Sequence, residues 1–376
     1  MKTIIFLLLL PLLNCFNFVY GQDWHFVSQT STNLVITDEL HGFYYENYSI
    51  GIHINGYRIY RSDNGNYNFN QILGGSGDSG CCGCDGLFCL DSETIFYIKT
   101  NAGNATVHRS INGVSTIVIP GFPQGSQTMY FTSPTVGYVT VDFTSAVFPD
   151  LLTFGVGGSN IYHDGYFFGG TQMEFINDST GFITGQDDHP SSVHNEVILK
   201  TSDFGNNITE VFITNEFEFK DIHFVADSVG IAIGTNGMIL KTQDTGVTWD
   251  VVNSNTSLSL NSIDFSDEGV GCIVGEEGLI LKSYDLGETW VQVPFIGTQN
   301  LIYVRIFNNE HIFINDETGS LYSSQDNSGV DELSNTNKTL VKILDMMGRE
   351  TTFKPNIPLI YVYDDGSTER VFSVEY

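Results

Sequence analysis

Thr242-Gln243-Asp244-Thr245-Gly246-Val247-Thr248-Trp249 decides the fold, because it returns 41 residues further on as Ser283-Tyr284-Asp285-Leu286-Gly287-Glu288-Thr289-Trp290. In both copies an aspartate stands two residues before a glycine and five before a tryptophan. A carboxylate in this position accepts backbone N–H groups within a turn, and the glycine takes a positive φ. Each copy therefore predicts a tight hairpin whose tryptophan packs between sheets.

The aspartate–glycine pair also occurs nearer the N-terminus. In Asp203-Phe204-Gly205 the aspartate lies 41 residues before Asp244, and Asp63-Asn64-Gly65 is a further copy. Asp326, 41 residues after Asp285, is a degenerate copy. We assign a structural role in these turns to Asp63, Gly65, Asp203, Gly205, Asp244, Gly246, Trp249, Asp285, Gly287 and Trp290. On turn chemistry this structural role is favoured over a role in catalysis or binding.

A second repeated pattern, which we call the phenylalanine–glycine register, recurs alongside the aspartate–glycine motif. Four phenylalanines each close a short apolar segment and are each followed six residues later by a glycine: Phe131 and Gly137, Phe175 and Gly181, Phe224 and Gly230, Phe265 and Gly271. Within one unit, strands are expected at 262–265, 272–274, 279–281 and 289–293, with turns between them. A four-stranded unit of about 41 residues is one blade of a β-propeller, since a single such sheet cannot bury both of its faces.

These registers predict an all-β chain with a seven-bladed β-propeller over residues 22–330. The first strands of the blades are expected near Phe43, Phe88, Tyr130, Glu174, His223, Asp264 and Val304. The last unit lacks a fourth strand, and Trp24-His25-Phe26-Val27 resembles the fourth strand of other units. We therefore expect the N-terminal strand to close the ring. Six blades is the alternative, because the first and third units are irregular.

The repeated motif resembles the Asp-box, which occurs in sialidases, sortilin-type receptors and photosystem II assembly-factor propellers. Together with the phenylalanine–glycine register, the resemblance is to the assembly-factor type. It covers about residues 220–295 well and the rest of 30–330 more loosely. The resemblance implies that the box is a hairpin device in a propeller.

The N-terminus predicts export. Lys2 precedes an apolar run over 4–13, and the small Gly21 follows, which is the order of a secretory signal peptide over residues 1–21. The run is too short to span a bilayer comfortably, and no later stretch is long and apolar enough to cross a membrane. A buried N-terminal helix is the alternative. We expect a secreted or cell-surface protein on the outer face of the outer membrane.

Residues 331–376 break the repeat pattern. A polar linker precedes strands expected at 339–344, at Leu359-Ile360-Tyr361-Val362-Tyr363 and through 371–374. The segment resembles the C-terminal sorting domain of type IX secretion cargo in Bacteroidetes, although it lacks the Tyr-Pro-Asn-Pro opening of longer versions. The matching residues include Asp345, Gly348, Arg349 and Glu350. The resemblance implies that export and type IX secretion machinery are partners; a plain β-appendage is the alternative.

Composition narrows the classes of ligand. The net charge is −29, and only nine lysines or arginines lie between Gln22 and Val330. A nucleic acid needs clustered cations, so nucleic-acid binding is excluded. High solubility outside the cell is the simpler meaning of the acidity.

Four of the six cysteines cluster in one loop region: Cys81, Cys82, Cys84 and Cys89. Their spacing does not supply two Cys-x2-Cys knuckles, so one or two disulfides are favoured over a metal site in an oxidising compartment. Four cysteines allow three connectivities, which stay open. Cys272 lies on an expected inner strand and is predicted to be a buried free thiol.

An insertion at 186–196 supplies the candidate binding residues Asp187, Asp188, His189 and His194. Carboxylates and imidazoles can hold a divalent cation, but a flexible polar loop has the same composition and is favoured. We therefore predict no metal. Gly155-x-Gly157-Gly158 lacks a strand before it and a helix after it, so no dinucleotide loop and no cofactor is expected.

Two functions remain. A sialidase needs three arginines that converge on a substrate carboxylate, and the candidates are Arg58, Arg61, Arg109 and Arg305. Arg61 and Arg109 occupy equivalent hairpins on neighbouring blades and are not expected to converge. We predict a non-catalytic propeller that binds a protein or a glycan. The alternative is a divergent sialidase-like glycoside hydrolase, which a carboxylate pair in the central funnel would favour.

Overall fold

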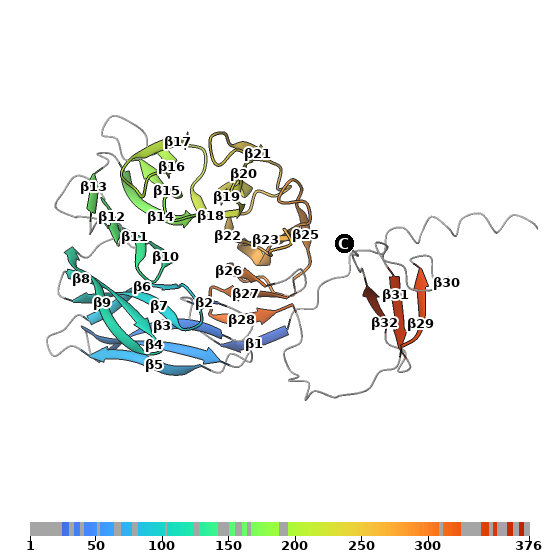
Figure 1. The fold of residues 1–376 in the computed structure, drawn as a ribbon, viewed down its shortest axis with the longest axis horizontal. Coiled ribbons are helices and arrows are strands. Elements are labelled where there is room, and N and C mark those ends of the chain that lie inside the picture. The colour runs from blue at the N-terminus through green and yellow to red at the C-terminus, as the bar shows by residue number, and fades with distance from the viewer. Residues whose placement is uncertain are drawn as a thin grey trace, which may run out of the picture. The chain divides into compact units, whose positions relative to one another are not determined.

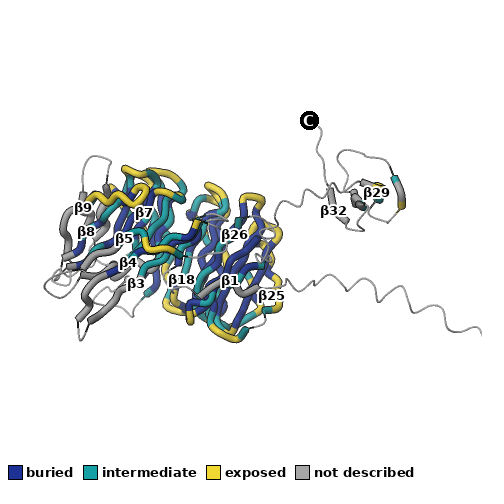
Figure 2. Tube along the Cα trace, turned by 90° about the horizontal axis from the view of Figure 1, so that it is seen from below, coloured by how far each residue is buried: buried dark blue, intermediate teal, exposed yellow. Residues whose placement is uncertain are grey.

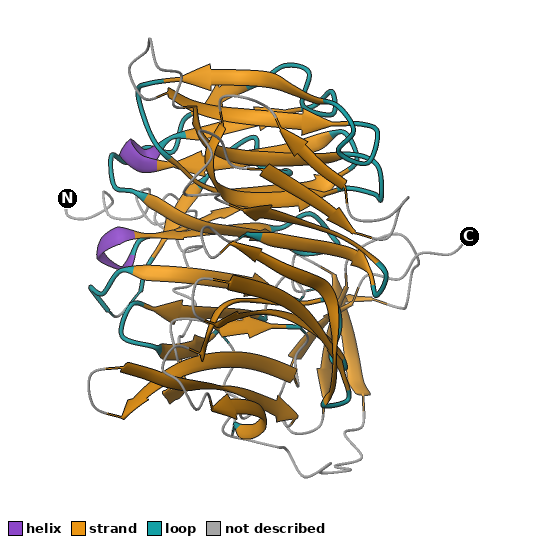
Figure 3. Ribbon diagram, turned by 90° about the vertical axis from the view of Figure 1, so that its left-hand side faces the viewer, coloured by secondary structure: helices purple, strands orange, loops and turns teal. Residues whose placement is uncertain are grey.

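The computed structural model describes residues 25–29, 34–37, 41–50, 53–63, 69–76, 82–101, 104–123, 128–141, 150–154, 160–163, 167–187, 195–295, 297–307, 311–324, 340–345, 349–351, 359–363 and 368–371. Within these residues the chain is almost all β-strand, with two 3-10 helices, η1 (Thr235–Gly237) and η2 (Glu276–Gly278) (Figure 3). The chain divides into two compact units, residues 1–328 and 329–376.

Six sheets of the first unit are antiparallel meanders of four consecutive strands, arranged around a common centre (Figure 1). The first three are β2 (Leu34–Ile36), β3 (His41–Ile50), β4 (His53–Asp63) and β5 (Asn70–Ser76); β6 (Cys82–Cys89), β7 (Thr94–Asn101), β8 (Asn104–Ile111) and β9 (Val114–Pro123); and β10 (Met129–Ser133), β11 (Val136–Val141), β12 (Asp150–Phe154) and β13 (Asn160–His163). The next three are β14 (Phe167–Phe175), β15 (Gly181–Asp187), β16 (Asn195–Thr201) and β17 (Ile208–Thr214); β18 (Phe219–Ala226), β19 (Val229–Gly234), β20 (Ile239–Thr242) and β21 (Asp250–Val252); and β22 (Leu260–Phe265), β23 (Gly271–Gly275), β24 (Ile280–Ser283) and β25 (Val291–Val293).

One further sheet is composite. It joins β26 (Leu301–Ile306), β27 (Ile312–Asp316) and β28 (Ser320–Ser323) to β1 (His25–Gln29). β1 runs antiparallel to β28, with His25 opposite Ser323 and Gln29 opposite Ser320. The predicted closure by the N-terminal strand is confirmed. Trp24 itself lies outside the described residues. The closure pairs two strands that would otherwise be exposed edges, so the first unit is a closed β-propeller.

The predicted start of the first blade is wrong. Phe43 lies on β3, the second strand of its sheet, and the innermost strand is the short β2. The first blade has no phenylalanine–glycine pair to mark its innermost strand, and β3 and β4 are 10 and 11 residues long. In the sequence, the long strands β3 and β4 therefore stand out more clearly than the short β2. The other six expected first strands coincide with β6, β10, β14, β18, β22 and β26.

The phenylalanine–glycine register has a steric cause. Phe224 is paired across the sheet with Gly230, and Phe265 with Gly271. Each phenyl ring lies over the glycine, so that a Cβ at Gly230 would stand 2.5 Å from Phe224 Cε1, and one at Gly271 would stand 2.6 Å from Phe265 Cε1. The same arrangement holds for the earlier two pairs. Only glycine fits beneath the ring.

The Asp-box turns have the predicted geometry wherever they are described. The Asp244 carboxylate accepts hydrogen bonds from Val247 N (2.9 Å), Thr248 N (2.8 Å) and Thr248 Oγ1 (2.7 Å). These bonds lower the pKa of Asp244 to about 2. Gly246 has a φ of +70°. Asp285 with Gly287 and Asp203 with Gly205 repeat the turn. Asp63 ends β4 beside Arg61, and Gly65 lies outside the described residues.

The hydrophobic core lies between neighbouring sheets. Figure 2 shows buried strands (dark blue) through the body of the propeller and exposed residues (yellow) at many of its turns. Trp290 is 4% exposed and packs edge-on against Phe265, with ring centroids 5.9 Å apart. Trp249 makes the equivalent contact with Phe224 at 6.2 Å. Both tryptophans therefore pack between sheets, as predicted.

Lysines on two third strands, β16 and β20, each link their blade to the next, a feature that the sequence patterns do not predict. Lys200 Nζ donates to the Thr245 carbonyl (2.6 Å), and Lys241 Nζ donates to the Leu286 carbonyl (2.7 Å). Lys241 also pairs with Glu288 at 2.8 Å. Each lysine therefore satisfies a carbonyl in the Asp-box turn of the following blade, whose backbone has a positive φ at that point.

The second unit holds one four-stranded sheet in the order β30-β29-β31-β32. Its strands are β29 (Leu340–Asp345), β30 (Glu350–Thr351), β31 (Leu359–Tyr363) and β32 (Thr368–Val371). The strands expected at 339–344 and 359–363 are present. Of the sorting-motif residues, Asp345 ends β29, Arg349 is exposed and Glu350 begins β30, while Gly348 lies outside the described residues. Within the described residues, no helix has the length and apolarity to span a membrane.

Candidate binding cavity on the propeller axis

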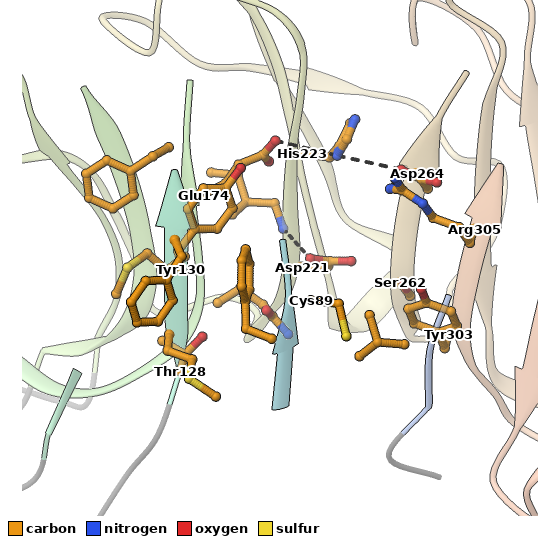
Figure 4. Close-up of a pocket in the computed structure, with 18 of the residues that line it drawn as sticks. Cys89, Thr128, Tyr130, Glu174, Asp221, His223, Ser262, Asp264, Tyr303 and Arg305 are labelled. Carbon is orange, nitrogen blue, oxygen red and sulfur yellow. Dashed lines mark hydrogen bonds and ion pairs between the residues drawn. The ribbon is translucent and has the colours of Figure 1, made fainter. Parts of the chain in front are cut away.

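Within the described residues, the innermost strands of the first unit's sheets line one axial cavity of about 950 Å³. Figure 4 shows that its side chains come from strands far apart in sequence. Alternate residues of a strand point to the same side, so each innermost strand presents residues i and i+2 to the axis. The residues between them, such as Ile222 and Ile263, are buried in the cores between blades.

The repeat places five polar side chains of the cavity at one position of the innermost strands. Tyr130, Glu174, His223, Asp264 and Arg305 each stand one residue before the last buried residue of their innermost strand. A second layer stands two residues earlier, and from it Asp221, Ser262 and Tyr303 line the same space. The signal that could have found the first layer is the residue before each register phenylalanine, since it must face the axis.

The acids of this cavity link neighbouring blades. Glu174 Oε2 accepts a hydrogen bond from Phe224 N (2.9 Å), Asp221 Oδ2 accepts one from Ile263 N (3.0 Å), and Asp264 Oδ2 accepts one from Ile306 N (2.7 Å). Innermost strands of different blades do not pair with one another, so these inward N–H groups have no ladder partner. The acids supply the acceptors.

Tyr303 continues the series across the closure. Its hydroxyl accepts a hydrogen bond from Ile36 N (3.1 Å), which joins β26 to β2. Four consecutive junctions, from β14 to β2, are therefore bridged by a side chain of one strand and the backbone of the next.

Burial controls the ionisation of this group. Burial raises the pKa of Glu174 well above its ordinary value, and the neighbouring Asp221 charge adds to the shift. Burial likewise raises the pKa of Asp221 to about 7. Burial lowers the pKa of His223, whose Nδ1 lies 3.6 Å from Glu174 and 3.9 Å from Asp264. Asp264 raises the pKa of Arg305, and the two are joined at 3.2 Å.

The opposite wall is aromatic. Phe88 on β6 and Tyr130 on β10 have ring centroids 5.2 Å apart, and Tyr130 lies 5.8 Å from Phe175. Burial raises the pKa of Tyr130, and it raises that of Tyr303 to about 12, so both phenols stay protonated at neutral pH. The cavity therefore combines a charged wall and an aromatic wall.

The carboxylate arrangement bears on glycoside hydrolysis. Glu174 and Asp264 both approach His223 Nδ1, so the two approaching oxygens are at most about 8 Å apart, a separation that glycosidases use. However, Asp264 is 3% exposed and its two oxygens contact Arg305 and the Ile306 N–H. Of the four arginines considered, only Arg305 lines the cavity within the described residues. Arg109 instead donates to the Pro134 carbonyl at 2.6 Å.

The sequence-predicted binding loop is not at this site in the described residues. Asp187 is the last residue of β15, where it pairs with Phe167 and Asn195, and Asp188, His189 and His194 lie outside the described residues. No group of three or more potential metal ligands is present within the part of the chain that the structure describes.

The structure describes the side chains of two cysteines, Cys89 and Cys272. Cys89, at the end of β6 beside the cavity, is a free thiol, and as the last residue of an innermost strand it packs with apolar side chains between blades. Cys81 lies outside the described residues, and for Cys82 and Cys84 only the backbone on β6 is described. Cys272 is a buried free thiol, as predicted, and burial raises its pKa to about 12.

Comparison with known proteins supports this architecture. Residues 202–334 match the family model described as photosynthesis system II assembly factor YCF48. A solved structure of YCF48 bound to D1 peptide is similar, with a TM-score of 0.57 and 13% identity over 80% of this chain and 95% of that one. The fold is a β-propeller of this kind. No curated protein matches.

Two further solved structures share the fold. YCF48 from Cyanidioschyzon merolae has a TM-score of 0.51 and 14% identity, and covers 80% of this chain and 98% of that one. The GH74 xyloglucanase from Xanthomonas campestris has a TM-score of 0.58 and 12% identity, and covers 91% of this chain and 59% of that one. Identities this low show the fold alone, and both an assembly factor and a hydrolase have it.

Proposed function

We propose that this chain is an exported, non-catalytic β-propeller that acts as a binding or interaction module. The observation that carries the proposal is the use of the acids in the cavity. Glu174, Asp221 and Asp264 each accept a backbone N–H of the next blade, which is a structural task. Asp264 is further held by Arg305. Groups so engaged hold neighbouring blades together, and the cavity they frame is large enough for a ligand.

A protein is the favoured partner, and a neutral glycan is the alternative. We count the composite sheet as a seventh blade, so that a closed ring holds the loops and the cavity in fixed positions. A similar solved propeller, YCF48, is bound to a peptide, which supports protein binding here by analogy of fold.

The absence of catalysis is testable. We expect the mature protein to release nothing from a sialic acid glycoside, from neutral aryl glycosides or from xyloglucan, because its buried acids are engaged with backbone donors. Product release is compared with that of the Glu174→Gln variant. Equal background rates are expected. Turnover by the wild-type protein that is lost in Glu174→Gln or Asp264→Asn would show that it is an enzyme.

A glycoside hydrolase is the second candidate function, on one specific observation. The Glu174 and Asp264 carboxylates flank the same His223 nitrogen at 3.6 and 3.9 Å, and a similar fold belongs to a xyloglucanase. The assay above distinguishes the two functions.

Export and sorting form the other half of the proposal. The apolar N-terminus and the resemblance of residues 331–376 to a type IX sorting domain support delivery to the cell surface or medium. Deletion from Asn337 onward is expected to trap the protein in the periplasm, as measured by fractionation and surface proteolysis. A control deletion of 334–336 in the polar linker should leave delivery intact. Normal surface delivery without the tail would contradict the proposal.

A further inference from the structure

We infer that the axial cavity binds the basic side chain of a protein partner, with its ammonium group at Glu174 and Asp221 and its aliphatic stem against Phe88 and Tyr130. This inference rests on the proposed binding function and names the chemistry of the ligand. It follows from the distribution of charge and aromatic surface around the cavity.

The charged wall carries uncompensated acid. Within the described lining, the acids are Glu174, Asp178, Asp221 and Asp264, and the one arginine is Arg305. Arg305 lies 3.2 Å from Asp264 and neutralises it. Glu174 and Asp221 are left with backbone N–H groups, Ser262 and His223, whose pKa is lowered by burial. A cation between β14 and β18 would supply the missing opposite charge.

The aromatic wall suits the rest of such a side chain. Phe88 and Tyr130 offer ring faces, and a cation over an aromatic face is attracted to it. Thr132, which also lines the cavity, has a buried hydroxyl that makes no hydrogen bond within the described residues.

Binding of this kind is coupled to protons. The pKa values of Glu174 and Asp221 are raised, so in the empty cavity these acids hold protons at mildly acid pH. An ammonium group favours their ionised forms, and protons leave when it binds. Affinity therefore rises with pH until the acids are ionised in the free protein.

The other titratable groups around the pair do not reverse this sign. They are Cys89 on β6, Tyr130 on β10, Asp178 after β14, His223 on β18, Asp264 on β22, and Tyr303 and Arg305 on β26. The thiol and the phenols have raised pKa values and stay neutral, and the pKa of His223 is lowered.

The experiment is calorimetry of the full-length mature protein with acetyl-Ala-Lys-Ala-amide at pH 5 to 8. Matched probes carry norleucine or glutamate in place of lysine. We expect the lysine peptide to bind at least tenfold more tightly than the norleucine peptide at pH 7, and the glutamate peptide not to bind. Between pH 5 and 7 its Kd should fall about tenfold per pH unit for each proton displaced. Buffers of different ionisation enthalpy count the protons.

Three variants complete the test. Glu174→Gln and Asp221→Asn should each weaken lysine-peptide binding at least tenfold and flatten its pH dependence. The exposed Glu218→Gln, which lies outside the cavity, should change neither. Glu174→Gln retains an acceptor for Phe224 N and so is expected to fold even if Asp221→Asn does not.

Several results would overturn the inference: no lysine-peptide binding, equal affinity for the norleucine peptide, or preference for glutamate. Binding of uncharged peptides alone would refute this inference yet leave the proposed binding function standing, whereas glycoside turnover would refute the latter.

Discussion

Asp264→Ala is expected to lower the free energy of unfolding by about 3 kcal/mol, because it removes a buried acceptor and a counter-charge together. Asp264 is 3% exposed, and it bonds to Ile306 N at 2.7 Å and to Arg305 at 3.2 Å. Without it, the Ile306 N–H and the guanidinium lose their partner at the junction of β22 and β26. Arg305 is 40% exposed, so water recovers part of its loss, which keeps the estimate at the low end for buried pairs.

Chemical denaturation measures this effect, and two further variants separate its parts. Asp264→Asn keeps a carbonyl oxygen for Ile306 N and should lose only about 1–2 kcal/mol. The exposed Glu268→Ala, in the following turn, should change stability by less than about 0.5 kcal/mol. Asp264→Ala with unchanged stability would show that the acid does not link the two blades.

Gly230→Ala is expected to cost about 2–3 kcal/mol, because the new methyl group overlaps the Phe224 ring. The Cβ would stand 2.5 Å from Phe224 Cε1, and the ring is confined by Phe182, stacked at 4.2 Å, and by Trp249. The ring must shift, and the core between β14–β17 and β18–β21 shifts with it. Thermal and denaturant unfolding of the variant measure the loss.

A double mutant identifies the cause. Phe224→Leu removes the ring that clashes, so Gly230→Ala should cost at least 1 kcal/mol less in the Phe224→Leu background than in the wild type. Gly113→Ala is the comparison variant: it has a positive φ but nothing within 4 Å of the Cβ, so its cost of about 1 kcal/mol is backbone strain alone. Equal costs for Gly230→Ala in both backgrounds would exclude the steric explanation.

The sequence could locate much of the candidate site, but it could not show which groups its side chains contact. The repeat placed Tyr130, Glu174, His223 and Asp264 on first strands, and innermost strands must surround the axis. Which of their neighbours they bond depends on distances between blades. Such distances are set by side-chain packing between sheets, and the repeat interval of the sequence does not reveal that packing. In the sequence alone, the polar residues of the loop at 186–196 stand out more than these alternating positions do.

The sequence by itself determined the all-β class, the unit of about 41 residues, the Asp-box turns and the closure by the N-terminal strand. These features depend on local turn chemistry and on residues that recur at a constant interval, so a linear pattern records them. The tertiary structure alone decided that β2 rather than the Phe43 strand is innermost, that Cys89 is free, and that Glu174, Asp221 and Asp264 bond the next blade. These depend on which groups meet across separate sheets, and that is settled by packing around a closed ring.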